Sequence, residues 1–184
     1  MFRMSGIYRD VCLYNVPKVS VRDHVLTASF SEDYKKARLN VRLDIDDRDG
    51  LKQKKTLAVR LFSPQGELVK EGEREFGPVE GSEFDIAFDV DDVQLWSDET
   101  PNLYTVNVVM RDAEGRDEMA FSTKYGFRDI QIRNSLVYVN GKRIFFKGVN
   151  RHDTDPLRGR AVENSTMLRD LTLMKQNNIN MVRT

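Results

Sequence analysis

The sequence contains a single cysteine, Cys12, and no excess of either charge, because 29 acidic residues balance 29 basic ones. One cysteine excludes an internal disulfide and a cluster of thiolate metal ligands. Its apolar neighbours favour a buried, inert thiol over a catalytic one. Because the charges balance and are interspersed along the chain, nothing in them points to nucleic acid or an anionic membrane as a partner.

Long apolar runs are also missing from the sequence. No run approaches the roughly 20 residues that a helix needs to span a bilayer. The first ten residues, "MFRMSGIYRD", lack the apolar stretch of a secretion signal. We therefore expect a soluble protein with no membrane partner.

Up to about residue 124, the sequence has the period of two that is typical of strands with one face in water. The predicted strands are residues 24–30, 37–46, 56–62, 82–90, 103–110 and 118–126. Glycine-containing turn sequences such as "SPQG" and "DAEG" fall between them. About seven short strands in roughly 100 residues suggest an immunoglobulin-like sandwich of two antiparallel sheets. Trp96 and Tyr104 are expected to pack in the core at one end of this sandwich.

After residue 126 the pattern changes. The Asn140–Gly141 pair between two apolar runs is the strongest short hairpin signal in the chain. The second arm of this hairpin, Ile144 to Val149, has few polar positions, which suits a strand covered on both faces.

Residues 164–178 read as a helix, with Asn164 or Ser165 as its cap and Asn177 or Asn178 as its left-handed stop. The sequence "INMV" that follows begins another strand. A strand, a helix and a strand in this order form a βαβ unit, whose two strands should be parallel. Because one such unit cannot complete a domain, we expect the sequence to be a piece of a longer chain.

Polar residues gather where these parallel strands end. Asn150, Arg151, His152 and Asp153 follow the first strand, and Arg183 lies at the end of the second. In parallel α/β architectures, active groups collect at the carboxyl ends of strands. From the pattern alone, a structural loop with a turn at residues 155–156 is as plausible as a functional one. The other histidine, at position 24, lies in a sandwich strand, and we expect a structural or surface role for it.

Three stretches of the sequence carry a family resemblance. Residues 125–184, with the motifs "KGVNRHDTDP" and "LMKQNNINMVRT", resemble the start of the catalytic barrel of family 2 glycoside hydrolases, especially the large bacterial β-galactosidases. "LWSDETPNLY" resembles their immunoglobulin-like domain, and "MFRMSGIYRDV" the end of the sugar-binding jelly-roll domain that precedes it. The resemblance implies a mostly β chain. Its parts are the end of a jelly-roll domain (1–10), an immunoglobulin-like antiparallel β-sandwich (11–124) and the first βαβ portion of a (β/α)₈ TIM barrel (125–184).

The resemblance also implies a reaction. These enzymes are retaining glycosidases that use one glutamate as acid/base and a second as nucleophile. In the family both glutamates come from later barrel strands, so we expect them beyond Thr184. The 184-residue chain is then a bracing domain with the opening part of the barrel, has no catalytic residue of its own, and is expected to be inactive alone.

The family match assigns supporting roles to the residues at the strand ends. His152 matches a residue that contacts the sugar, and Arg183 matches the arginine that orients the nucleophile. Asn150 and Arg151 match the motif with less defined roles. Asp153 stands where the family has glutamate, so an acidic group is retained on a shorter side chain.

The resemblance further implies a β-galactoside substrate and a homo-oligomeric longer enzyme. The compartment is left open between the cytoplasm and the periplasm of a bacterium. No cofactor is expected in this chain, and any Mg²⁺ would be held by residues outside it. The chain by itself is expected to self-associate through its barrel portion. Two alternatives stay open: an independent carbohydrate-binding or interaction module, and a piece of a β-glucuronidase relative. The sandwich sequence shows no cluster of exposed aromatics for stacking sugars, which disfavours the module.

Overall fold

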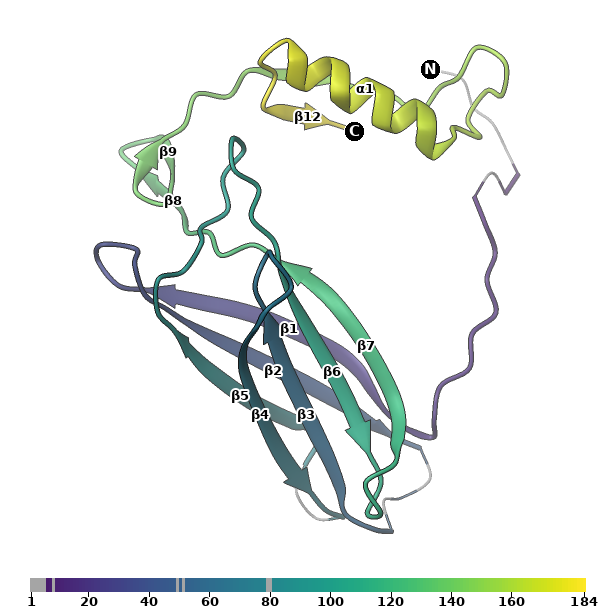
Figure 1. Cartoon of the computed structure of the whole chain (residues 1–184). Coiled ribbons are helices and arrows are strands. Elements are labelled where there is room, and N and C mark those ends of the chain that lie inside the picture. Colours follow the sequence, from purple (N-terminus) through teal and green to yellow (C-terminus); the bar gives the residue numbers. More distant parts are fainter. Residues whose placement is uncertain (1–5, 8, 49, 51, 79–80) are drawn as a thin grey trace. The chain divides into compact units, whose positions relative to one another are not determined.

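The computed structural model describes residues 6–7, 9–48, 50, 52–78 and 81–184. The elements are β1 (Val19–Phe30), β2 (Ala37–Asp47), β3 (Lys55–Phe62), β4 (Leu68–Phe76), β5 (Glu83–Val90), β6 (Tyr104–Arg111), β7 (Asp117–Tyr125), β8 (Ile130–Arg133), β9 (Leu136–Val139), β10 (Lys142–Arg143), β11 (Gly148–Asn150), α1 (Asn164–Gln176) and β12 (Met181–Arg183) (Figure 1). Among the described residues, no helix has the length and apolar character needed to cross a membrane.

The chain divides into two compact units. The sandwich unit is Asn15–Arg143, and the βαβ unit combines Met1–Tyr14 with Ile144–Thr184. The domain limits expected from the sequence, after residues 10 and 124, stay predictions.

The sandwich unit contains the two predicted antiparallel sheets. One has the strand order β1-β2-β5 and the other β4-β3-β6-β7, with every neighbouring pair antiparallel. Each of the six predicted strands is present, so the sandwich prediction is confirmed. Within the described ranges, β4 brings the number of sandwich strands to seven.

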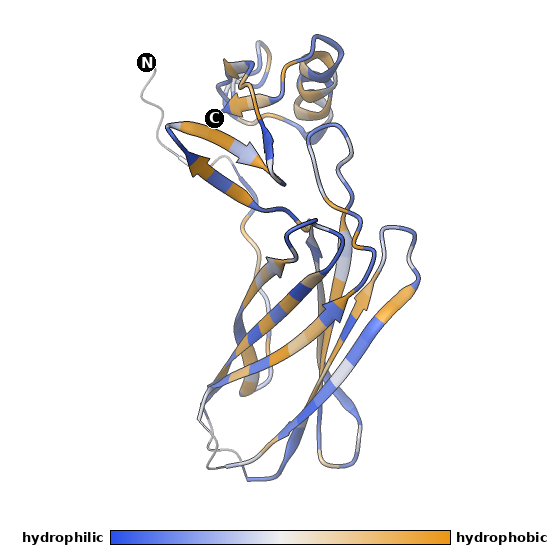
Figure 2. Cartoon of the chain, turned by 90° about the vertical axis from the view of Figure 1, so that its left-hand side faces the viewer, coloured by the Kyte–Doolittle hydropathy of each residue, from blue (hydrophilic) through white to orange (hydrophobic). Residues whose placement is uncertain are grey.

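Strict alternation of side chains builds the core between these sheets. Along β2 and β5 every second residue is buried, and the residues between them face water. Figure 2 shows this as alternating orange and blue along the strands of the sandwich. Leu39, Leu43, Leu57 and Leu61 have no exposed surface. Complete burial of a leucine side chain contributes about 1.5–3 kcal/mol, so the core of the sandwich stabilises this unit from within.

Strand β4 was not predicted because its sequence, "LVKEGEREF", does not alternate. It is an edge strand, and only Phe76 in it is buried. Gly72 lies in its middle, where an added Cβ would come within 3.0 Å of the Phe88 ring from the other sheet. A side chain at this position would have to displace the Phe88 ring by a few tenths of an ångström, which glycine avoids.

The segment "LWSDETPNLY" closes one end of the sandwich, as predicted. Tyr104 is buried, its hydroxyl accepts a 3.0 Å hydrogen bond from the Gln94 N–H, and its ring packs edge-on against Phe127 at 4.8 Å. Trp96 is only half-buried, so its assignment to the core was wrong. The Arg128 guanidinium lies 4.7 Å from the centre of a Trp96 ring and makes a cation–π contact with it.

The Asn140–Gly141 hairpin is confirmed. Both residues have positive φ, 49° and 73°, as a type I′ turn requires, and they join β9 to β10. A second turn of the same kind, at Asn134 and Ser135 with φ of 49° and 61°, joins β8 to β9 and was missed because it lacks glycine. The Asn140 amide donates a 2.9 Å hydrogen bond to the Trp96 carbonyl, which fixes the hairpin to the end of the sandwich.

The predicted strand over Ile144–Val149 was wrong. Strand β10 ends at Arg143 and β11 begins only at Gly148, while Phe145 and Phe146 are exposed. The intervening backbone bonds to Asn180 instead of a strand, and the Asn180 backbone N–H donates to the Lys147 carbonyl at 3.1 Å. The Asn180 amide donates to the Phe145 carbonyl at 3.0 Å and accepts from the Lys147 N–H at 2.9 Å.

Two further predictions about the βαβ unit need correction. Cys12 is exposed, not buried, because residues 11–14 belong to no strand of the described structure and present exposed side chains. Glu163, not Asn164 or Ser165, is the N-cap of α1, with no side-chain capping bond. The predicted stop of the helix is confirmed, because Asn178 has a positive φ of 58°.

Candidate functional site

The candidate site is built on the parallel pair β11 and β12, which α1 connects as the sequence predicts. Asn150 lies opposite Arg183 in the register of this pair. The Arg151 N–H continues the ladder with a 2.8 Å bond to the Arg183 carbonyl. Both strands therefore end at the same edge and bring Asn150, Arg151 and Arg183 together there.

His152 follows this edge directly, and its side chain is exposed, as are those of Asn150 and Arg183. An exposed imidazole and guanidinium at the ends of parallel strands can meet a polar ligand such as a sugar hydroxyl or a carboxylate. These three residues are therefore open to a ligand within the βαβ unit.

Arg151 and Asp153 are arranged differently, because each is engaged in ion pairs. The Arg151 guanidinium, only 11% exposed, bonds to Asp153 and, over 2.9 Å, to Asp170 of α1. These two hydrogen bonds, with Asp153 the stronger influence, raise the pKa of Arg151. The same Arg151 bond is the main cause that lowers the pKa of Asp153, so both groups stay charged.

The loop between β11 and α1 contains the predicted turn. The Asp155 carboxylate accepts hydrogen bonds from the N–H groups of Leu157 at 2.9 Å and Arg158 at 3.0 Å, and these bonds lower its pKa. Arg158 pairs in turn with Glu163, the N-cap of α1. The loop therefore has internal contacts of its own in addition to those of Arg151.

Sequence reasoning missed three residues of this site. Asp170 lies on α1, and nothing in the sequence pattern indicates that it pairs with Arg151. Asn180 was read only as the start of a strand, although it bonds the backbone on both sides of Phe146. Arg9 bonds to Asp153 at 2.6 Å from 144 residues upstream. No local spacing reveals such a long-range pair.

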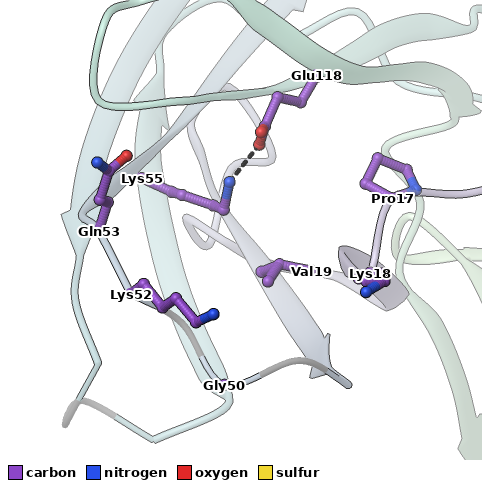
Figure 3. Close-up of a pocket in the computed structure, with 8 residues that line it drawn as sticks. All are labelled: Pro17, Lys18, Val19, Gly50, Lys52, Gln53, Lys55 and Glu118. Atoms are coloured by element: carbon purple, nitrogen blue, oxygen red, sulfur yellow. Dashed lines mark hydrogen bonds and ion pairs between the residues drawn. The ribbon is translucent and has the colours of Figure 1, made fainter.

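A separate pocket lies in the sandwich unit (Figure 3). It has a volume of about 470 Å³ and is lined by Pro17, Lys18, Val19, Gly50, Lys52, Gln53, Lys55 and Glu118. The partly buried Lys55 ammonium pairs with Glu118 across it, which neutralises one of the three lysines. None of its lining residues is aromatic, so it offers no stacking platform for a sugar ring.

The described part of the chain holds no group of three or more His, Cys, Asp or Glu residues that could hold a metal ion. The Mg²⁺ expected for a longer enzyme stays a prediction, and no role below is assigned to it.

Comparison with known proteins now decides the family. Residues 19–128 match the profile of glycosyl hydrolases family 2, and residues 130–184 match the TIM barrel domain of the same family. The chain belongs to glycosyl hydrolase family 2. Its parallel β11–α1–β12 arrangement is consistent with the start of that barrel.

A protein of Priestia megaterium named beta-galactosidase is 36% identical over 187 residues, which cover 100% of this chain and 18% of the relative. The chain thus spans less than a fifth of that relative's length.

Solved structures share the fold. A beta-glucuronidase of Parabacteroides merdae matches with a TM-score of 0.79 and 22% identity over 91% of this chain and 21% of that one. Beta-glucuronidase 3 of Bacteroides uniformis matches with a TM-score of 0.81 and 24% identity over 97% of this chain and 21% of that one.

Proposed function

We propose that this chain is part of a longer β-galactosidase that hydrolyses terminal β-galactosides with retention of configuration. The observation that carries the proposal is the 36% identity to a protein named beta-galactosidase along the whole chain. Membership of the glycosyl hydrolase family supplies the reaction class. In a retaining mechanism two carboxyl groups about 5–5.5 Å apart act as nucleophile and acid/base.

In this proposal His152 binds the galactose ring and Arg183 orients the nucleophile. Both side chains are exposed at the edge where β11 and β12 end, which supports these roles. A guanidinium next to a carboxylate keeps it ionised and fixes its direction. Asn150, opposite Arg183, would add a hydrogen-bonding group at the same edge.

The nucleophile and the acid/base are proposed to belong to the part of the longer enzyme outside these 184 residues. Residues 130–184 contain one glutamate, Glu163, and its carboxylate is engaged by Arg158. One ion-paired glutamate cannot serve as both nucleophile and acid/base, so the chain alone should be catalytically inactive. The sandwich would then brace the barrel, and the longer enzyme would form a homo-oligomer.

A β-glucuronidase is the second candidate, favoured by the names of the structural neighbours. The two substrates differ at C4, where the hydroxyl has the opposite configuration, and at C6, where a glucuronide has a carboxylate and a galactoside a hydroxymethyl group. Recognition of the carboxylate calls for a cationic group, and recognition of the hydroxyl for a neutral one. Substrate preference therefore separates the candidates.

The test is to express the complete open reading frame that contains this chain and to assay it on nitrophenyl β-galactoside and nitrophenyl β-glucuronide. We expect kcat/KM for the galactoside to be higher by roughly 100-fold or more, because a site built for one polar group rejects its replacement strongly. The reverse preference would reassign the enzyme as a glucuronidase, and turnover of neither substrate would overturn the proposal.

The third reading, an independent carbohydrate-binding module, is tested on the 184-residue chain alone. Isothermal titration with lactose and galactose should show no saturable binding. Clear binding would favour the module.

A further inference from the structure

Arg9 reaches a loop that lies far away in the sequence. Its guanidinium donates to the Asp153 carboxylate at 2.6 Å and to the Arg160 carbonyl at 3.2 Å. These acceptors lie near the two ends of the loop that follows β11. A single side chain of the segment 9–14 therefore contacts this loop at two points.

The Asp153 carboxylate is shared between two guanidinium groups. Arg9 approaches one of its oxygens and Arg151 the other. Arg151 extends the chain of charges to Asp170 on α1, and its backbone N–H bonds to Arg183 at the end of β12. The planar fork of arginine can bond two carboxylates at once, which lysine cannot do with the same geometry.

We propose that Arg9 is a positioning residue that docks the segment 9–14 on the loop after β11 and, through Asp153 and Arg151, holds His152 in place. Asp153 is then committed to this network and does not bind substrate. His152 is the exposed residue between Arg151 and Asp153, so both neighbours of the sugar-binding candidate are fixed by ion pairs. The catalytic consequence rests on the proposed galactosidase function, whereas the docking itself does not.

Cys12 provides a direct probe of the docking. It is the only cysteine, it is exposed, and it lies three positions after Arg9. A nitroxide attached to Cys12 of the 184-residue chain should show restricted motion. Arg9→Ala should raise the ratio of mobile to restricted label about threefold, a size typical of a partly exposed ion pair. Arg9→Lys, which keeps the charge, should have a smaller effect.

Arg38→Ala is the matched control, since it removes a comparable ion pair, Arg38 with Asp89 at 2.9 Å, from the sandwich unit. It should leave the label unchanged, and Trp96 fluorescence should verify that the sandwich is folded in every variant. A label equally mobile in wild type and Arg9→Ala, or equally affected by Arg38→Ala, would overturn the docking.

The positioning role is tested in the full-length enzyme by a double-mutant cycle between Arg9 and His152. Arg9→Ala should lower kcat several-fold, and it should have no further effect in the His152→Ala background, because it acts through that residue. An equal fall in both backgrounds, or no fall in either, would overturn the positioning role. A full-length enzyme without galactosidase activity would overturn the proposed function instead, while the label experiment would still decide the docking.

Discussion

The sandwich unit and the βαβ unit bury their apolar side chains to very different extents. The sandwich contains a cluster of buried residues from both sheets, many with less than 2% of their surface exposed. In the described part of the βαβ unit, Val162 is the one buried hydrophobic residue, and α1 has none. Large apolar side chains such as Phe145, Leu157 and Leu168 are exposed there instead.

This difference shows that each unit is stabilised internally by a different kind of interaction. The sandwich is stabilised by burial of apolar surface, which does not depend on any other part of the chain. The βαβ unit relies on a short parallel pairing, the amide of Asn180 and the ion pairs of Arg151. Partly exposed ion pairs stabilise weakly, so this unit should depend on additional partners for its stability.

The largest test of the comparison replaces one leucine in each unit by alanine. Leu43→Ala, at a position with no exposed surface, should lower the free energy of unfolding of the sandwich by about 2–5 kcal/mol. The Leu171 side chain in α1 is 49% exposed, so Leu171→Ala should change the free energy of unfolding by less than about 0.5 kcal/mol. Urea titration followed by Trp96 fluorescence reports on the sandwich directly. Equal effects of the two substitutions would refute the comparison.

The two histidines, one in each unit, extend the comparison to enzyme kinetics. In the full-length enzyme, His152→Ala should lower kcat/KM roughly 10- to 100-fold, since a hydrogen bond that tightens in the transition state is lost. His24→Ala should leave the kinetics unchanged, because His24 packs at 5.1 Å against the Phe121 ring within the sandwich. Should His152→Ala lose thermal stability but keep normal kinetics, the loop would be structural only.

Self-association should be confined to the βαβ unit. The exposed side chains of Phe145, Leu157 and Leu168 favour contact between copies of the chain. We expect sedimentation to show dimers or larger species for the 184-residue chain at high concentration. A chain of residues 15–143, which lacks this unit, should be a soluble monomer. A monomeric 184-residue chain would count against this prediction.

The smallest expected effect is the pH dependence of two turns, one in each unit. Backbone N–H groups lower the pKa of Asp155 in the βαβ unit, and the Arg116 N–H lowers the pKa of Asp112 in the sandwich. A lowered pKa in the folded state means that each carboxylate stabilises its turn above its unfolded pKa of about 3.9. That contribution is lost as the pH falls through the lower folded value.

Amide chemical shifts of Leu157 and Arg116 should therefore titrate with midpoints below the ordinary aspartate value of 3.8. Asp155→Asn should abolish the titration at Leu157, because asparagine does not ionise but can still accept the turn hydrogen bonds. The titration at Arg116, which reports on Asp112 in the sandwich, should stay intact. A midpoint above 3.8 at either amide would show that the carboxylate is not stabilised in that turn.

The same contrast between the units explains what the sequence predicts and what it does not. Residues 37–46 alternate so regularly that their strand and its buried face follow from the pattern. The Asn140–Gly141 turn follows from the φ that each residue tolerates. Strand β4 was missed because an edge strand with solvent on most of its surface has no need to alternate.

In the candidate site, the strand ends and their polar residues could be predicted, but the ion pairs could not. Asn150, Arg151 and Arg183 come together because parallel strands share an edge. Nothing in the local sequence connects Arg9 with Asp153, because 144 positions separate them and a surface charge gives no sign of its partner. Such pairs appear only when the fold brings distant segments together.

The central proposal is that these 184 residues support catalysis without performing it. The most direct measurement is the turnover of nitrophenyl β-galactoside by the purified chain, beside the full-length enzyme at equal molar concentration. We predict no turnover by the chain, because the glutamate pair is expected elsewhere in the longer protein. A rate within about tenfold of the full-length enzyme, which corresponds to a difference of only ~1.4 kcal/mol in the barrier, would contradict the account.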